Sequence, residues 1–121
     1  MQLNVKERFA LRTIFKPAAT SLFESDLYDE FLEKIKITSE EVKEIDMRSE
    51  NGQITWDATK DNGLEVEITE ALLNLLKRAV KDADERKRIP YDPDDKSLIE
   101  LARKILNYKI KKNGTDDKKK D

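Results

Sequence analysis

Paired acidic residues are the side chains of this sequence best placed to bind a metal ion. Asp26 and Glu30 are four residues apart, as are Asp29 and Glu33, so each pair would share one face of a helix. Such pairs could bind a divalent ion weakly, but they lack the glycine and the ligand spacing of an EF-hand loop. The acidic segment "YDPDDKS" is better explained as a turn and a helix cap. We therefore interpret these acids as solvated helix faces and caps, with no metal site.

The two residue types that carry most side-chain chemistry are missing from the chain. Its 121 residues include no cysteine and no histidine. This excludes disulfides, thiolate zinc sites, cysteine nucleophiles and a Ser-His-Asp triad, and it removes the usual general base near neutral pH. Catalysis would have to use carboxylates, lysine, tyrosine or a metal held by oxygen atoms. We expect a non-enzymatic protein without a cofactor, and a metal-dependent hydrolase that uses carboxylates is the second alternative.

A basic segment covers residues 77–88, "KRAVKDADERKR", with six basic residues against three acidic ones. Lys77, Arg78, Lys81 and Arg88 could contact the phosphates of a nucleic acid. The segment lacks the neighbouring aromatic residues or the recognition helix typical of nucleic-acid modules. Cations near the end of a helix are also favoured by the helix dipole alone. A small nucleic-acid-associated regulatory or packaging protein is therefore the first alternative function.

The opposite charge dominates an earlier part of the chain. Residues 24–50 carry ten acids against four bases, although the net charge of the whole chain is only −2. A dipolar surface of this kind suits electrostatically steered docking to another protein.

A tight hairpin is predicted at residues 48–57, "RSENGQITWD", because Asn-Gly favours a two-residue turn between strands. The register of such a turn places one set of side chains on a common face: Met47, Ser49, Ile54 and Trp56. Either this face packs on the long helix that follows, or Trp56 is an exposed anchor for a partner protein. Arg48 and Thr55 lie on the other face and are the residues to mutate in a test of binding.

Capping residues and apolar periodicity predict about five helices. Their expected caps are Asn4, Ser21 or Ser25, Thr38, Thr69, and Asp94 or Asp95. Glu7 and Glu41 are placed to complete capping boxes with Asn4 and Thr38. The helix after Thr69 should be the most buried and should run to Ile89-Pro90, and the first helix should end before Pro17.

The segment "GLEVEIT" at residues 63–69 alternates apolar and acidic residues, so it could add a third strand to the hairpin. The fold class we predict is α+β, mainly helical, with about five helices and a small two- or three-stranded antiparallel β-meander. Residues 1–110 should form a single globular domain, and residues 111–121 a disordered charged tail.

No apolar run approaches the length of a membrane span, and no signal peptide opens the chain, so we expect a cytoplasmic protein with no membrane partner. The first and last predicted helices carry more apolar residues than one narrow stripe needs. A homodimer through either of these helices is therefore an open alternative.

Four short motifs resemble a family of small uncharacterised proteins encoded by bacteriophages and prophages. They are "LNVKER" at residues 3–8, "SEE" at 39–41, "GQITW" at 52–56 and "EVEI" at 65–68. The resemblance covers most of residues 3–88, and the last helix and tail depart from it. It implies a phage accessory protein in the cytoplasm of a bacterial host and supplies no catalytic residue. We therefore expect a non-enzymatic accessory protein that binds another protein, from the host or the phage.

Overall fold

Helices dominate the computed structural model, which describes residues 1–18 and 21–110. In this part of the chain, five α-helices accompany two separate two-stranded antiparallel sheets, which confirms the mainly helical α+β class. The elements in chain order are β1 (Gln2–Leu3), α1 (Val5–Arg12), α2 (Leu22–Lys34), α3 (Ser39–Glu44), β2 (Arg48–Glu50), β3 (Gln53–Thr55), the 3-10 turn η1 (Ala58–Lys60), β4 (Leu64–Glu65), α4 (Glu70–Glu85) and α5 (Ser97–Asn107). The predicted disordered tail at 111–121 lies outside the described residues.

Side-chain caps begin four of the helices, as predicted. The Asn4 carboxamide oxygen accepts the Glu7 N–H at 2.8 Å, and the Glu7 carboxylate accepts the Asn4 N–H at 2.9 Å, which completes the capping box of α1. Hydroxyl oxygens of Ser21, Thr38 and Thr69 accept the N–H three residues later in α2, α3 and α4. These local signals were sufficient to place four helix starts because each cap satisfies a backbone donor that the helix itself leaves free.

Neither of the caps predicted for α5, Asp94 or Asp95, is its capping residue. Lys96 is the capping residue of α5, and its side chain makes no capping hydrogen bond. The Asp95 carboxylate instead accepts hydrogen bonds from the N–H of Ser97 at 3.1 Å and from its hydroxyl at 2.7 Å. Asp95 therefore shapes the turn that leads into α5.

Helix α4 ends at Glu85, earlier than the Ile89-Pro90 stop that the sequence predicted. Lys87 adopts a left-handed backbone conformation with φ of 57°. The Arg88 N–H then bonds to the carbonyl of Ala83 at 2.8 Å, and the Lys87 N–H bonds to that of Asp84 at 3.0 Å. This is the Schellman arrangement, which closes a helix before a proline is reached. Helix α1 ends at Arg12, before Pro17 as predicted.

The strand after the hairpin does not extend the hairpin into a meander. β4 pairs instead with β1, with Gln2 opposite Glu65 and Leu3 opposite Leu64, while β2 and β3 form their own sheet. The alternation in this segment buries Val66 together with Leu3 in the core. The segment therefore pairs with the buried start of the chain and not with the hairpin, because the pairing of a strand is determined by where its apolar face is buried.

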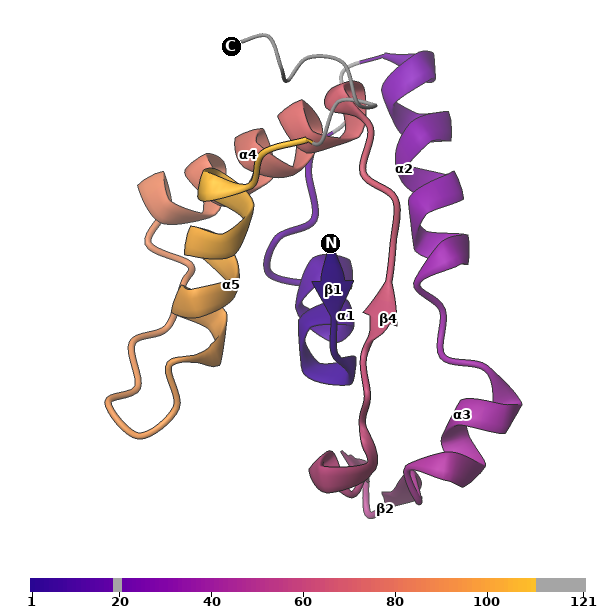
Figure 1. Ribbon diagram of the computed structural model, residues 1–121. Helices are drawn as coiled ribbons and strands as arrows, with labels where there is room; N and C mark the ends of the chain where they lie inside the picture. The colour runs from indigo at the N-terminus through magenta and orange to yellow at the C-terminus, as the bar shows by residue number, and fades with distance from the viewer. Residues whose placement is uncertain (19–20, 111–121) are drawn as a thin grey trace, which may run out of the picture.

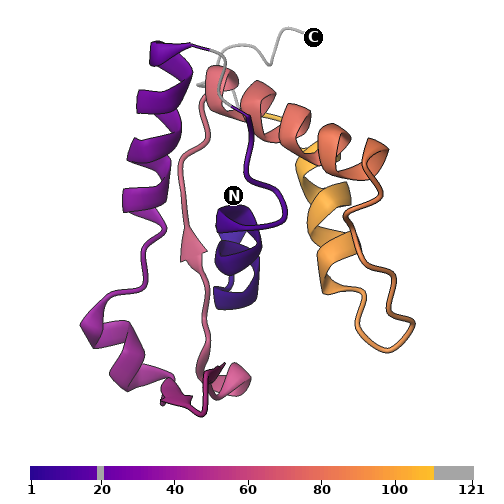
Figure 2. The ribbon, with the colours of Figure 1, turned by 180° about the vertical axis from the view of Figure 1, so that it is seen from behind.

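Helix α4 lies across one end of the molecule, with α2 on one side and α5 on the other (Figures 1 and 2). α1 and the β1–β4 pair lie between α2 and α5, and α3 and the hairpin lie at the end away from α4. α5 contacts both α4 and α1, and α2 contacts α4. The predicted apolar stripe of α4 is buried throughout: Leu72, Leu73, Leu75, Leu76, Ala79, Val80 and Ala83. Among the described residues, no helix combines the length and the apolar character needed to cross a membrane.

Candidate functional site

The basic residues predicted on α4 do not form one common face. Arg78 makes two hydrogen bonds to the Glu24 carboxylate, at 2.7 and 3.1 Å, and one to the carbonyl of Ala18 at 3.3 Å. The hydrogen bonds to Glu24 raise the pKa of Arg78 above its usual value. This side chain therefore joins α4 to α2, and its charge is already engaged.

The other three basic residues keep their charges available. Lys77 is half-buried, while Lys81 and Arg88 are exposed, and none of the three makes an ion pair with a described residue. Lys77 and Lys81 are one helical turn apart, so they share a face of α4. Arg88 follows the end of the helix. The four residues that were predicted together thus divide into one structural and three surface cations.

The register of the hairpin is confirmed. Arg48 lies opposite Thr55, and the turn residues Asn51 and Gly52 have φ of 52° and 78°. Positive φ at both positions is what a two-residue hairpin turn of this kind requires. Arg48 and Thr55 are exposed.

The prediction that the hairpin face packs on α4 is wrong. Ile54 is 49% exposed, and no residue of β2 or β3 is buried. Trp56 is half-buried, and its ring lies 5.7 Å from that of Phe9 in α1, at an angle of 55°. The hairpin cannot reach α4 because it lies at the opposite end of the molecule (Figure 1). Trp56 therefore packs on the outside of α1 and is neither a core residue nor a freely exposed anchor.

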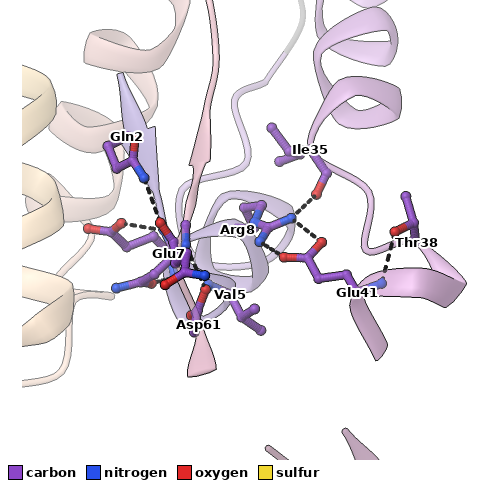
Figure 3. Close-up of polar contacts among 11 residues, drawn as sticks. Gln2, Val5, Glu7, Arg8, Ile35, Thr38, Glu41 and Asp61 are labelled. Carbon is purple, nitrogen blue, oxygen red and sulfur yellow. Dashed lines mark hydrogen bonds and ion pairs between the residues drawn. The ribbon is translucent and has the colours of Figure 1, made fainter. Parts of the chain in front are cut away.

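An ion pair that sequence reasoning missed joins α1 to α3 (Figure 3). The Arg8 guanidinium is 1% exposed and donates two hydrogen bonds to the Glu41 carboxylate, one of them at 3.0 Å. It also donates to the carbonyl of Ile35 at 3.5 Å, and its Nε is buried with no partner in the described part of the chain. Glu41 therefore does not complete the predicted capping box, although its N–H still bonds to the Thr38 hydroxyl at 3.1 Å. The burial of Arg8 was indicated by the sequence, because Arg8 lies three residues from both Val5 and Leu11, on the apolar face of α1.

A second polar cluster holds the start of α1 against the segment before β4 (Figure 3). The Asp61 carboxylate accepts hydrogen bonds from the N–H of Val5 at 2.8 Å and of Gly63 at 3.0 Å. Glu7, beyond its capping role, pairs with Lys104 of α5 at 3.0 Å. These polar groups satisfy one another and connect secondary-structure elements, so we assign them a structural role.

The acidic residues considered as metal ligands are spread along the outside of α2. Asp26, Asp29, Glu30 and Glu33 are all exposed. In residues 1–18 and 21–110, no three acidic side chains gather closely enough to hold a metal ion. In the acidic turn before α5, hydrogen bonds from Lys6 and Ser97 hold the pKa of Asp95 below its usual range.

An apolar groove lies between α4 and α5, with a volume of about 370 Å³. Its lining is Val80, Lys81, Asp84, Ile89, Ile99, Ala102, Arg103 and Leu106. Val80 and Ala102 are buried at its floor, and Leu106 is 37% exposed. Lys81 and Arg103 are exposed cations beside the groove, and neither makes an ion pair with a described residue. Lys81 is the one predicted site residue that lines it.

This groove could not be recognised from the sequence. Each helix showed its apolar stripe, but the space between two stripes depends on how the helices cross. An apolar floor beside free cations can receive apolar side chains of a partner that also carries acids.

No protein-family model, curated protein or solved structure matches this chain. The resemblance to phage and prophage proteins therefore stays a prediction.

Proposed function

We propose that this protein is a non-enzymatic accessory protein of phage or prophage origin, which binds another protein in the cytoplasm of a bacterial host. The origin and the location rest on the sequence resemblance alone. The protein-binding role is carried by one observation, the apolar groove between α4 and α5 with two cations beside it that make no ion pair with a described residue.

The chemistry of the groove favours a protein segment over a nucleic acid. A phosphate backbone would use Lys81 and Arg103 and leave the apolar floor without a partner. An amphipathic helix would bury apolar side chains on the floor and set acidic ones beside the cations. Asp84 is the one acid in the lining, so the cations outnumber it. The expected ligand is therefore an acidic amphipathic segment.

Nucleic-acid binding is the weaker candidate because the four cations predicted to contact phosphates do not form one common surface. Arg78 is engaged by Glu24, and of the other three predicted cations only Lys81 lines the groove. Retention on DNA or RNA at low salt would favour this alternative.

A tagged full-length chain, used to capture proteins from phage-infected bacteria, tests the proposal. Leu106→Glu places a charge in the groove, and Ile54→Glu makes the same kind of change at an exposed hairpin residue. We expect the wild type and Ile54→Glu to capture the same protein, and Leu106→Glu to lose it. Cross-links from the groove should map to an acidic amphipathic segment of that protein.

Equal capture by the Leu106→Glu variant would contradict the assignment of the groove. Circular dichroism of both variants establishes that they fold. Leu106 and Ile54 are partly exposed at 37% and 49%, so neither substitution forces a charge into the core.

A further inference from the structure

The start of α2 carries two large apolar side chains that the fold leaves uncovered. Leu22 is 80% exposed and Phe23 is 66% exposed, the highest exposures among the large aliphatic and phenylalanine side chains described. Side chains of this size gain free energy when they leave water, and two adjacent ones at the end of a helix form a compact projection.

Acidic residues continue the same outer face of α2. Asp26 follows Leu22 by four residues and Phe23 by three, and Glu30 follows Phe23 by seven, so these side chains share one side of the helix. Asp26 and Glu30 are exposed and make no ion pair with a described residue. The exposed side of α2 thus combines apolar side chains at its start with acidic side chains further along, and this combination fits the apolar floor and the cations of the groove between α4 and α5.

We propose that the groove of one molecule receives the start of α2 from a second copy of this chain. Leu22 and Phe23 would enter the apolar groove, and the acids of α2 would face Lys81 and Arg103. This inference rests on the groove being a docking site, as proposed above, and it names a partner for it.

The positions of the two surfaces decide the symmetry of the assembly. α2 and α5 lie on opposite sides of α1 and the β1–β4 pair (Figures 1 and 2). The contact therefore joins two different surfaces, head to tail, so in a pair of copies one keeps a free α2 and the other keeps a free groove. Such contacts generate rings or open chains of copies instead of a closed two-fold dimer.

Two single variants and their mixture test the proposal by analytical ultracentrifugation of the full chain. The wild type should associate with rising concentration, and high salt should weaken the association because it screens the charges. Phe23→Ser removes the projection, and Leu106→Glu blocks the groove. Each should weaken self-association about thirtyfold or more, as expected for a central interface residue.

An equimolar mixture of the two variants gives the sharpest result. The Phe23→Ser copy keeps its groove and the Leu106→Glu copy keeps its α2, so one intact contact should form. We expect a one-to-one dimer that grows no further. Ile54→Glu, the matched control, should associate as the wild type does.

The outcomes separate this inference from the proposed function. A wild type that remains monomeric at all concentrations overturns the inference, and so does an associating wild type whose two variants do not combine in the mixture. If Leu106→Glu nevertheless loses capture of another protein, the groove is a docking site and only the self-association is wrong. If Leu106→Glu retains that capture, the groove is not the docking site on which the proposed function rests.

Discussion

The buried pair between Arg8 and Glu41 predicts a large and specific loss of stability on a change of one atom. Glu41→Gln keeps the shape of the side chain and the backbone N–H that Thr38 caps, but it removes the negative charge. The Arg8 guanidinium is 1% exposed, so water cannot replace the lost partner.

The magnitude follows from burial. Removing one partner of a buried ion pair costs about 3–5 kcal/mol, because it leaves a charge without compensation. The glutamine still offers one acceptor, and the Glu41 side chain is 20% exposed, so we expect a somewhat smaller loss, about 2–4 kcal/mol. The urea midpoint should fall by roughly 2 M if the slope is about 1.5 kcal/mol per molar urea.

Urea unfolding measures this loss, followed by the fluorescence of the single tryptophan and by circular dichroism. Glu40→Gln is the matched control, since Glu40 is exposed on the same helix and pairs with no described residue. It should change the free energy of unfolding by no more than about 0.5 kcal/mol. Equal midpoints for the two variants would refute the reasoning. Replacing Arg8 and Glu41 together by methionine should restore much of the stability, because no buried charge is left.

Three further predictions concern the fold. Lys87→Gly should raise the free energy of unfolding by about 0.5–1 kcal/mol, since φ is 57° at this position and glycine adopts positive φ without strain; a thermal melt that shows destabilisation would count against it. Tyr28 donates a hydrogen bond to the carbonyl of Leu11, and burial raises the pKa of Tyr28 above its usual value of about 10. The neutral form of Tyr28 therefore stabilises the fold below pH about 10, and this contribution is lost as the pH rises further. Tyr28→Phe should lower the free energy of unfolding at neutral pH by about 1–2 kcal/mol and should flatten the decline of stability at alkaline pH. Unfolding curves that the substitution leaves unchanged at neutral and at alkaline pH would speak against this. A double-mutant cycle on Phe9 and Trp56, whose rings lie 5.7 Å apart, should give a coupling of about 0.5–1.5 kcal/mol, and a coupling near zero would mean that the rings do not interact.

Local features were predictable from the sequence because each depends on a few neighbouring residues. The Asn4 and Thr69 caps each satisfy a donor three residues away. The hairpin register follows from two turn residues, Asn51 and Gly52. The apolar stripe of α4 was likewise readable from spacing alone.

Features that depend on distant parts of the chain were not predictable in the same way. The pairing of β1 with β4 involves two residues from each strand, too few for a pattern. The partner of Arg8 lies 33 residues away, and nothing near Arg8 points to it. The early end of α4 at Glu85 depends on a left-handed lysine at position 87, where glycine would have been the expected signal.

The candidate site shows the same division. Lys81 was identified as a surface cation from the sequence. That Arg103 and Leu106 line the same groove was not predicted, because their position relative to Lys81 depends on how α4 and α5 pack. The projection at Leu22 and Phe23 was also missed. Apolar residues at a helix start are expected to face the core, and only the direction of α2 shows that these two do not.

Photo-cross-linking at the groove tests the central claim most directly. A photoreactive phenylalanine replaces Arg103 beside the groove or, as the control, Arg48 on the exposed face of the hairpin, and the full chain is irradiated in phage-infected bacteria. We expect adducts from position 103 that map to an acidic amphipathic segment, either α2 of a second copy or a segment of another protein, and few from position 48. Adducts confined to position 48, or none from position 103, would contradict the assignment of the α4–α5 groove as the docking site.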